Sequence, residues 1–448
     1  MGRVKNAYDA IAYRTFPRRQ THPDRLAAIG KLFGMDPAAV KNCRVLEVGC
    51  GNAANLIPMA YYLPESRITG FDLAEAPVAE GRDVAEDLGL ANLDLRVADL
   101  CSFGDGEPAF DYIFAHGLYS WVPAPVRDGL LALCGRLLAP QGVAFVSYNC
   151  YPGRYPRQMI REMLMYHIRD VEEPQERIKE ARKLLDRLDH PEAAAMREQR
   201  DDSLFHDDLA PVNDPVWFRD FAAHAARHGL QYLGEAESHK TFRHEMAPDD
   251  VMEWEQYADF LSLRRFRRTL LCHAEVKLDR ANVSERLNDL RFSVDAAVKQ
   301  KTESTAVEAV AQALHDAGPV PVEFAELVPY AGGEGQLREV LFSLLCAGAV
   351  NPHLHDFVCA DEAGERPRAS GLARYQAARG QLVTSVCHVP VQLDTMAAEL
   401  VQLLDGSRTR EQVARALAKL EGAPTRKELQ RGLPGSLDWL AHMGLLEA

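Results

Sequence analysis

The sequence has no run of about 18 consecutive apolar residues, the length that a helix needs to span a bilayer. Its N-terminal stretch, MGRVKNAYDAIAYRTFPRRQ, also lacks the apolar centre of a secretion signal. These two absences exclude insertion into a membrane and predict a cytoplasmic protein.

Paired cysteines are absent as well. The nine cysteines are scattered singly, without a CxxC pair or a Cys/His spacing typical of zinc sites. The histidine groups HPE (190–192), HDD (206–208) and HLH (353–355) show no metal-binding spacing either. We therefore expect reduced thiols and no metal site. No Ser/His/Asp or Cys/His pattern suggests a nucleophilic enzyme.

Basic residues are outnumbered. The 51 Lys and Arg residues face 65 Asp and Glu residues, which gives a formal net charge of −14. Such a surface repels phosphate backbones and anionic lipids, so nucleic acid is not an expected partner. The one dense basic run, RRFRR (264–268), is expected to be a solvated face.

What the sequence does contain is an alternation of short apolar runs and longer amphipathic ones. At 448 residues and 47% hydrophobic composition, the chain is long enough for two to four domains. The alternation from Arg44 to about Tyr151 indicates βαβ units and a doubly wound, Rossmann-like α/β sheet. The expected strands are 44–48, 67–71, 93–98, 110–115 and 142–148. Helices are expected to start near Asn55 and to cover Val126 to Leu138.

The rest of the chain separates into smaller units. Residues 154–200 lack strand signals and predict a helical insertion, after which strands at 230–236 and 266–273 would complete a mixed sheet. Two segments beyond residue 300 each end in a helix, a Gly turn and a short apolar strand, which favours winged-helix-like domains. The Gly/Pro/Arg-rich stretch 360–371 is interpreted as a linker between them. The predicted domains are 1–153, 154–215, 216–300 (a regulatory region that completes the sheet), 301–360 and 371–448.

The string VLEVGCGNAANL (45–56) carries the strongest chemical signal. Gly49 and Gly51 allow a tight turn between a buried strand and a helix, where the backbone can approach a ligand closely. The third position of the G-x-G-x-G pattern is Ala53, so the motif needs support from its surroundings.

Three acidic residues give that support. Asp72 follows Gly51 by 21 residues, at the end of the second strand, where a carboxylate accepts ribose hydroxyl bonds. NAD enzymes share this arrangement, but Glu47 before the glycines would repel a pyrophosphate. Glu47 suits the ammonium and sulfonium of S-adenosylmethionine (SAM), and Asp99 is placed to accept a bond from an adenine amino group.

Loops after the fourth and fifth strands form the rim of the ligand crevice in such sheets. The catalytic candidates there are His116, Tyr119, Trp121 and Tyr148, with Asn149 and Tyr151 beside them. Methyl transfer is an in-line displacement, so alignment and exclusion of water supply most of the catalysis. An amine acceptor must first lose a proton, with which His116 or a tyrosine hydroxyl can help. The N-terminal segment with Tyr8 and Tyr13 is interpreted as a lid over the cofactor.

The chain resembles bacterial class I SAM-dependent methyltransferases that carry a methyltransferase regulatory domain, including the rickettsial-type protein lysine methyltransferases. The resemblance covers most of the chain. Its longest strings are CRVLEVGCGNAANLIPMA (43–60), AHGLYSWVP (115–123), YNCYPG (148–153), LFHDDLAPVNDP (204–215) and EQYADFLSLRRFRRTLLCH (255–273).

The resemblance implies methyl transfer from SAM to lysine side chains of proteins by a homodimer. In the family's best-known members the substrates are outer-membrane proteins. Together with the strand-end positions, it makes the cofactor-binding candidates Tyr13, Glu47, Gly49, Gly51, Asn52, Asp72, Leu73, Asp99, Leu100 and His116. Two alternatives remain: a small-molecule N- or O-methyltransferase, and a regulatory protein that binds SAM without catalysis. The acidic balance favours protein contact over DNA contact for the winged-helix-like domains.

Overall fold

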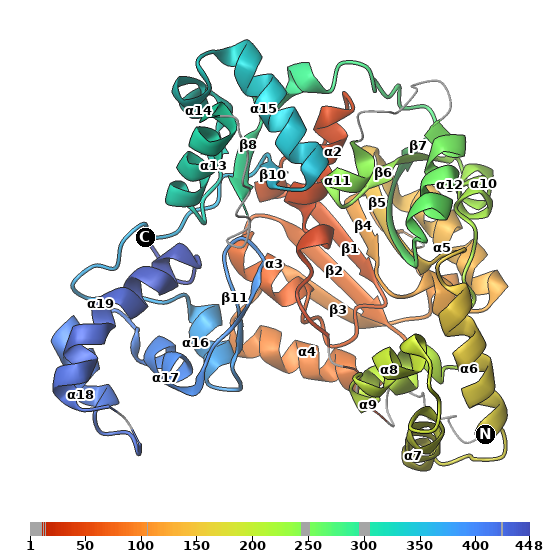
Figure 1. The fold of residues 1–448 in the computed structure, drawn as a ribbon, viewed down its shortest axis with the longest axis horizontal. Coiled ribbons are helices and arrows are strands. Elements are labelled where there is room, and N and C mark those ends of the chain that lie inside the picture. The colour runs from red at the N-terminus through yellow and green to blue at the C-terminus, as the bar shows by residue number, and fades with distance from the viewer. Residues whose placement is uncertain are drawn as a thin grey trace.

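A seven-stranded sheet with the order β3-β2-β1-β4-β5-β7-β6 forms the centre of the molecule (Figure 1). The computed structural model describes residues 11, 13, 15–104, 106–242, 251–294, 305–422 and 424–448. The strands are β1 (Arg44–Val48), β2 (Arg67–Asp72), β3 (Leu93–Val97), β4 (Phe110–Ala115), β5 (Leu138–Asn149), β6 (Leu230–Glu235) and β7 (Phe266–His273). The first five run parallel, and β7 is antiparallel to both of its neighbours. The predicted doubly wound mixed sheet is confirmed.

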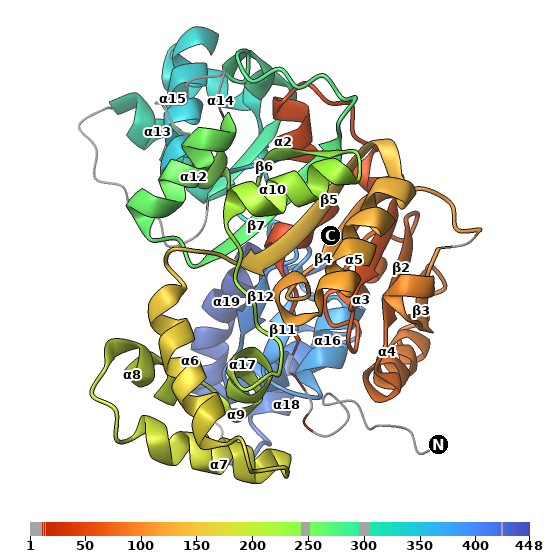
Figure 2. The ribbon, with the colours of Figure 1, turned by 90° about the vertical axis from the view of Figure 1, so that its right-hand side faces the viewer.

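Helices cover both faces of this sheet. The first face carries α2 (Pro23–Leu32), α3 (Leu56–Tyr62) and α4 (Glu75–Asp87), and the second carries α5 (Ala124–Leu137) and α10 (Phe218–Arg227). Figure 2 brings α5 and α10 in front of the strands. Because both faces are covered, the central strands are nearly continuous apolar runs, which is why the sequence reveals them.

The boundary between α5 and β5 differs from the prediction. The helix ends at Leu137 and the strand begins at the next residue, four positions before the expected start. The register of β4 with β5 shifts at this point, between Phe110 and Tyr112. Such an irregularity accommodates Pro140, which cannot donate a ladder hydrogen bond.

The predicted helical insertion is present between β5 and α10. It comprises α6 (Tyr155–His167), α7 (Pro174–Leu185) and α8 (Pro191–Arg197), followed by the short α9 (Asp201–Ser203) and one π-helical turn, Leu204–Asp208. These elements have a small core of their own, which includes Leu164, Ile178 and Leu185. None of the described helices is long and apolar enough to cross a bilayer.

The basic run 264–268 is not the solvated face expected from the sequence. Arg267 is fully buried, and its guanidinium contacts carboxylates of Glu235, Glu255 and Asp259 at 2.5 to 2.9 Å. Two of these acids lie on α12 (Val251–Ser262), so the buried charges join that helix to β7. The prediction was wrong because the compensating acids lie on other elements.

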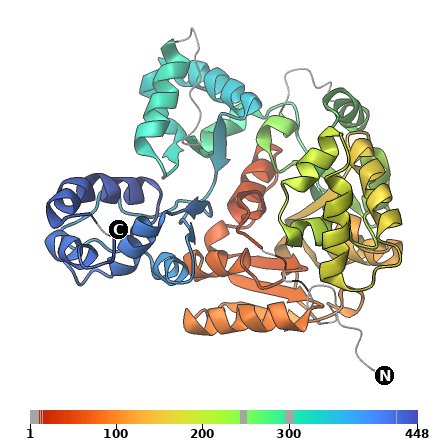
Figure 3. The ribbon, with the colours of Figure 1, turned by 60° about the horizontal axis from the view of Figure 1, so that its bottom comes forward.

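The C-terminal third forms two further lobes, visible beside the sheet in Figure 3. The middle lobe contains α13 (Thr305–Ala317), α14 (Phe324–Ala331), α15 (Glu334–Ala347), and a sheet of β8 (Arg291–Val294), β9 (Val322–Glu323) and β10 (Val350–His353). The last lobe contains α16 (Gly371–Ala377), α17 (Thr395–Leu403), α18 (Arg410–Leu417), α19 (Arg426–His442) and the hairpin β11 (Leu382–Thr384) with β12 (Pro390–Gln392). Helices with a small hairpin are the expected winged-helix-like arrangement. Ala363 and Ala369, from the predicted linker, pack in the core of the last lobe.

Candidate functional site

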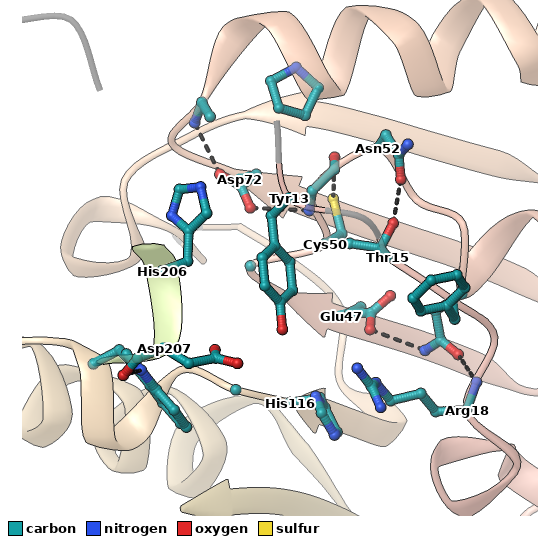
Figure 4. Close-up of a pocket in the computed structure, with 18 of the residues that line it drawn as sticks. Tyr13, Thr15, Arg18, Glu47, Cys50, Asn52, Asp72, His116, His206 and Asp207 are labelled. Atoms are coloured by element: carbon teal, nitrogen blue, oxygen red, sulfur yellow. Dashed lines mark hydrogen bonds between the residues drawn. The ribbon is translucent and has the colours of Figure 1, made fainter. Parts of the chain in front are cut away.

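A cavity of about 520 Å³ opens at the carboxyl ends of the parallel strands, where ligands bind in open α/β sheets. Its wall combines the turn after β1, the end of β2, the loop after β4, the start of β7, the helical insertion and the segment before α2. Figure 4 shows labelled side chains from several of these elements around one space. The cavity therefore assembles residues from position 13 to position 268.

The turn after β1 has the backbone shape that the glycine pattern predicts. Gly49 and Gly51 have φ values of 74° and 54°, a region that favours glycine. The amides of Gly49 and Cys50 both donate to the Phe71 carbonyl oxygen, at 2.9 and 3.1 Å, which ties the turn to β2. Ala53, at the third glycine position, is buried and retains a left-handed φ of 58°. The alanine therefore leaves the left-handed backbone in place.

Asp72 lies at the end of β2, in the cavity wall, next to this turn. One carboxylate oxygen accepts a hydrogen bond from the Gly51 amide and the other from the Ala74 amide, both at 2.9 Å. Each oxygen retains a second lone pair for a ligand hydroxyl. The structure thus brings together the two features that the 21-residue spacing predicted, in a geometry suited to a ribose.

The other expected adenosine contacts, Leu73, Asp99 and Leu100, are not among the residues that line the cavity. Leu73 is 64% exposed, Leu100 is buried, and Asp99 is exposed and accepts a hydrogen bond from the Cys101 amide at 2.9 Å. Leu73 follows the end of β2, and Asp99 and Leu100 lie two and three residues after the end of the neighbouring strand β3. Their role in holding adenine stays a prediction.

Glu47 is the buried acid of the site, with 5% of its surface exposed. One oxygen accepts a hydrogen bond from Asn55 Nδ2 at 2.9 Å, and the other has no hydrogen-bond partner among the described residues. Burial raises its pKa to about 8, although Asn55 and the nearby Arg18 act in the opposite direction. A buried carboxylate oxygen that lacks a donor fits the ammonium of SAM.

The segment before α2 contributes a group that the sequence reasoning missed. Arg18 lies in the cavity wall near Glu47, and burial lowers its pKa (Figure 4). An acid and a guanidinium side by side match the ammonium and carboxylate of an amino acid. The available signal was the basic PRR run inside a segment already expected to cover the cofactor.

The same segment, which the sequence analysis interprets as a lid, contributes side chains to the cavity wall. Tyr13, Thr15 and Phe16 line the wall, and the Thr15 hydroxyl bonds to Asn52 Oδ1. Asn52 is therefore held between the glycine turn and the segment. The other predicted lid residue, Tyr8, lies outside the described residues.

Asn55 connects this site to the last lobe. Its Oδ1 accepts a hydrogen bond from the backbone amide of Arg18 at 2.9 Å and also lies 3.0 Å from Nε2 of His388. Its Nδ2 donates a hydrogen bond to Glu47. His388 is buried in the turn between β11 and β12, with a left-handed φ of 58°. A C-terminal side chain thus helps to orient the residue that bonds Glu47.

The loop after β4 supplies His116, Gly117 and Trp121 to the wall. The Nε2 atom of His116 is buried without a hydrogen-bond partner among the described residues, and burial holds the pKa of this ring well below its usual value. The ring is therefore neutral and available to a ligand. The Trp121 indole donates to the Asp207 carbonyl oxygen at 3.3 Å.

Tyr119 and Tyr148, expected among the catalytic residues, lie outside the cavity wall. Tyr148 is fully buried, stacks on Phe221 with ring centroids 4.1 Å apart, and bonds to the Thr269 hydroxyl at 3.0 Å. The Tyr119 hydroxyl bonds to His224 Nδ1 at 2.8 Å. Both rings belong to the core beneath α5 and α10, so we assign them to packing rather than to contact with substrate.

Their neighbours divide in the same way. Asn149 lines the cavity and donates to Asn213 at 2.8 Å. Tyr151 stacks on Tyr155, with ring centroids 4.3 Å apart, and is not part of the wall.

Asp207 is a second group that the sequence reasoning missed. It belongs to the π-helical turn of the insertion and lies in the wall, with Tyr13 between it and Glu47 (Figure 4). Burial, followed by the adjacent Asp208, raises its pKa to about 6. Asp208 itself is paired with Arg157 at 2.6 Å. The cavity therefore contains an acid remote from the glycine turn.

Three family models match separate parts of the chain. A model described as a methyltransferase domain matches residues 45–142, a predicted methyltransferase regulatory domain matches 200–273, and the model "PKMT, C-terminal winged helix domain" matches 365–432. The three matches follow the order of sheet, regulatory region and last lobe.

Known proteins show the same similarity. RP028 of Rickettsia prowazekii is 32% identical over 243 residues, which cover 51% of this chain and 97% of that protein. RP789 of the same organism is 35% identical over 298 residues, or 61% of this chain and 54% of that protein, so the match spans about half of its length. A trans-aconitate 2-methyltransferase of Methylobacterium nodulans is 32% identical over 144 residues, 31% of this chain and 49% of that enzyme. The structure of PKMT2 from Rickettsia typhi in complex with AdoHcy covers 97% of this chain and 100% of that one, with 24% identity and a TM-score of 0.83.

Proposed function

We propose, because this chain belongs to the family of SAM-dependent methyltransferases with a methyltransferase regulatory domain and a PKMT-type winged helix domain, that it methylates lysine side chains of a protein substrate. The observation that carries the proposal is a carboxyl group, Asp207, in the cavity wall on the far side of Tyr13 from Glu47.

The cofactor half of the cavity is built from residues near the glycine turn. SAM supplies a methyl group made electrophilic by its sulfonium. Glu47 and Arg18 would hold the amino acid end, and Asp72 would hold the ribose. The Tyr13 segment covers this half and keeps water out, which supports a displacement that depends on alignment.

The remaining half suits an amine. Asp207 attracts an ammonium, and the aromatic faces of Trp121 and Phe266 in the same wall hold the alkyl stem or the cation. Tyr13 places its hydroxyl toward the space between Glu47, Asp207 and His116 (Figure 4). Acceptor and donor would therefore meet near Tyr13.

The amine must be neutral when it attacks. Arg18 and Arg268 line the same cavity, and their positive charge disfavours the protonated form of the acceptor amine. Asp207 or the neutral His116 can accept the departing proton, directly or through the Tyr13 hydroxyl.

A small carboxylic acid is the second candidate acceptor. Arg18 and Arg268 would bind its carboxylates, and a trans-aconitate 2-methyltransferase is similar to this chain over 144 residues. Arg268 already forms an ion pair with Glu237, however, which weakens its attraction for a carboxylate of the acceptor.

The test is to incubate the purified protein with methyl-labelled SAM and a cell lysate separated into proteins and metabolites. We expect label in protein, recovered as methyl-lysine after hydrolysis, and its loss in Asp72→Ala. Label confined to metabolites would support the carboxylic acid candidate. SAM binding without any transfer would support a regulatory protein.

A substitution in the insertion tests the acceptor half directly. Asp207→Asn should raise KM for the protein substrate at least tenfold while the affinity for SAM changes less than twofold. Asp186→Asn, an exposed change on the same insertion, is the matched control and should alter neither value. Equal kinetics for the two variants would remove Asp207 from the proposal.

The family resemblance extends the proposal to outer-membrane proteins as substrates, to a homodimer and to a cytoplasmic location. The net charge of −14 favours a freely diffusing protein over one held by nucleic acid or anionic lipid. Sedimentation of the full chain and fractionation of cells would test assembly and location.

A further inference from the structure

Three metal-ligating side chains meet on the outer surface of α5 and α10, outside the cofactor cavity. Asp128 projects from α5, His224 lies on α10, and His228 is the residue that caps the C-terminal end of α10. Their ligand atoms all lie within 4.8 Å of one another. The two helices belong to segments matched by different family models, the methyltransferase domain and the regulatory domain.

The geometry is convergent. Both histidine Nε2 atoms point at the same oxygen, Asp128 Oδ1, at 3.0 Å from His224 and 2.9 Å from His228. Two imidazole nitrogens and one carboxylate oxygen are a donor set typical of Zn²⁺ and related divalent transition metals. Asp128 is 56% exposed at its side chain, whereas the histidines are only 12% and 18% exposed. An ion could therefore enter from solvent and retain a water ligand.

A second, independent feature supports a metal. The other ring nitrogen of His224, Nδ1, lies 2.8 Å from the hydroxyl of Tyr119, a residue buried against Phe221. Metal-bound histidines characteristically bond an outer partner through the nitrogen that faces away from the metal. Tyr119 would accept this bond when Nε2 of His224 binds an ion, so the ring is already oriented as a ligand.

We propose that Asp128, His224 and His228 bind one divalent transition-metal ion, best matched by Zn²⁺, which joins α10 of the regulatory domain to α5 of the methyltransferase domain. Tyr119 extends the connection inward, because it lies in the loop that also carries Gly117 and Trp121 of the cavity wall. The proposal does not depend on the identity of the methyl acceptor.

The full-length protein, freed of metal with a chelator, is titrated with Zn²⁺ against a chromophoric chelator. We expect one ion per chain in wild type and at least a tenfold loss of affinity in Asp128→Asn and in His228→Ala. His167→Ala is the matched control, because His167 also lies near a carboxylate, Glu180, at 3.8 Å on the surface, but belongs to no such cluster in the described residues. Equal binding by wild type and His228→Ala would overturn the proposal.

Three further measurements keep the test independent of folding defects. Co²⁺ bound in place of Zn²⁺ should give a spectrum without thiolate charge-transfer bands, and such bands would place the ion on a cysteine and refute the site. Tyr119→Phe should weaken Zn²⁺ binding roughly tenfold, the usual effect of losing an outer hydrogen bond. Zn²⁺ should also slow hydrogen exchange of α10 amides, and unchanged exchange would refute the link between the two helices.

Discussion

Burial of the Glu47 carboxyl disfavours its charged form in the absence of a ligand. Its pKa of about 8 compares with 4.5 for an ordinary glutamate, and burial is the main cause. Between these two values the folded protein keeps a proton that the unfolded chain has lost, so stability falls as pH rises from about 4.5 to 8. At pH 7 this cost is roughly 3 kcal/mol, from about 1.4 kcal/mol for each pH unit.

Replacing Glu47 with glutamine removes the titration and keeps an oxygen for the Asn55 hydrogen bond. The ligand-free variant should therefore be more stable than wild type at pH 7 and 8 and nearly equal at pH 4.5. Melting temperatures over this pH range measure the difference. A variant that melts below wild type at pH 8 would refute the idea that the buried charge is costly.

The same substitution should weaken binding of the demethylated cofactor product, which has the same amino acid end as SAM. A charged hydrogen bond contributes about 1.5 to 3 kcal/mol, so the loss should be at least tenfold. At pH 7 about nine-tenths of the Glu47 side chains are protonated before binding, given a pKa of about 8. Binding to wild type should therefore release nearly one proton.

Calorimetry in buffers of different ionisation enthalpy measures that proton. Glu47→Gln should release almost none, whereas Glu80→Gln, at an exposed acid in the same cavity wall, should behave as wild type. If wild type releases no proton at pH 7, then Glu47 does not pair with the ligand ammonium and the assignment fails.

Three further substitutions test other assignments. Tyr148→Phe should lower stability by about 1 kcal/mol through loss of the Thr269 hydrogen bond and leave kcat within twofold; a tenfold fall in kcat would return Tyr148 to the active site. Ala53→Gly should change the free energy of unfolding by less than about 1 kcal/mol, because glycine removes the strain of a left-handed alanine but adds conformational entropy to the unfolded chain. Calorimetry should show an unchanged affinity for the demethylated cofactor product, and a tenfold loss would contradict this. Arg267→Met should cost about 3 to 5 kcal/mol in denaturant unfolding, because buried Glu235 loses its arginine partner while Glu255 and Asp259 keep only Arg264, and a neutral result would refute that network.

The sheet was predictable because its strands are local. Each is an apolar run bounded by turn residues, so β1, β2 and β4 match the expected spans within one residue. The glycine turn and Asp72 were predictable for the same reason, since their spacing is fixed by one βαβ unit. The start of β5 was missed because a register shift decides it, and that depends on pairing with β4.

The rest of the site depends on contacts between distant parts of the chain. Arg18 and Asp207 reach the cavity from the N-terminal segment and the insertion. The basic PRR run is the one local signal for Arg18, and it does not say which side chain faces the cavity. Tyr148 lies outside the cavity wall because side chains alternate along a strand, so it faces α10 while Asn149 faces the cavity.

The candidate metal cluster was missed for a related reason. His224 and His228 are close in sequence at the end of α10, but Asp128 comes from another helix 96 residues before His224, and no local spacing indicates that the three meet.

The contact between His388 and Asn55 makes the last lobe part of the cofactor site in a thermodynamic sense. The docked lobe contributes free energy to orienting Asn55 and, through it, Glu47. Because such linkage is reciprocal, a bound cofactor should stabilise the docked position of the lobe by the same free energy. A protein that binds the C-terminal lobe would therefore change the affinity of the enzyme for its methyl donor without contacting the donor. For the same reason, a chain shortened before residue 371 would not have the donor affinity of the full chain.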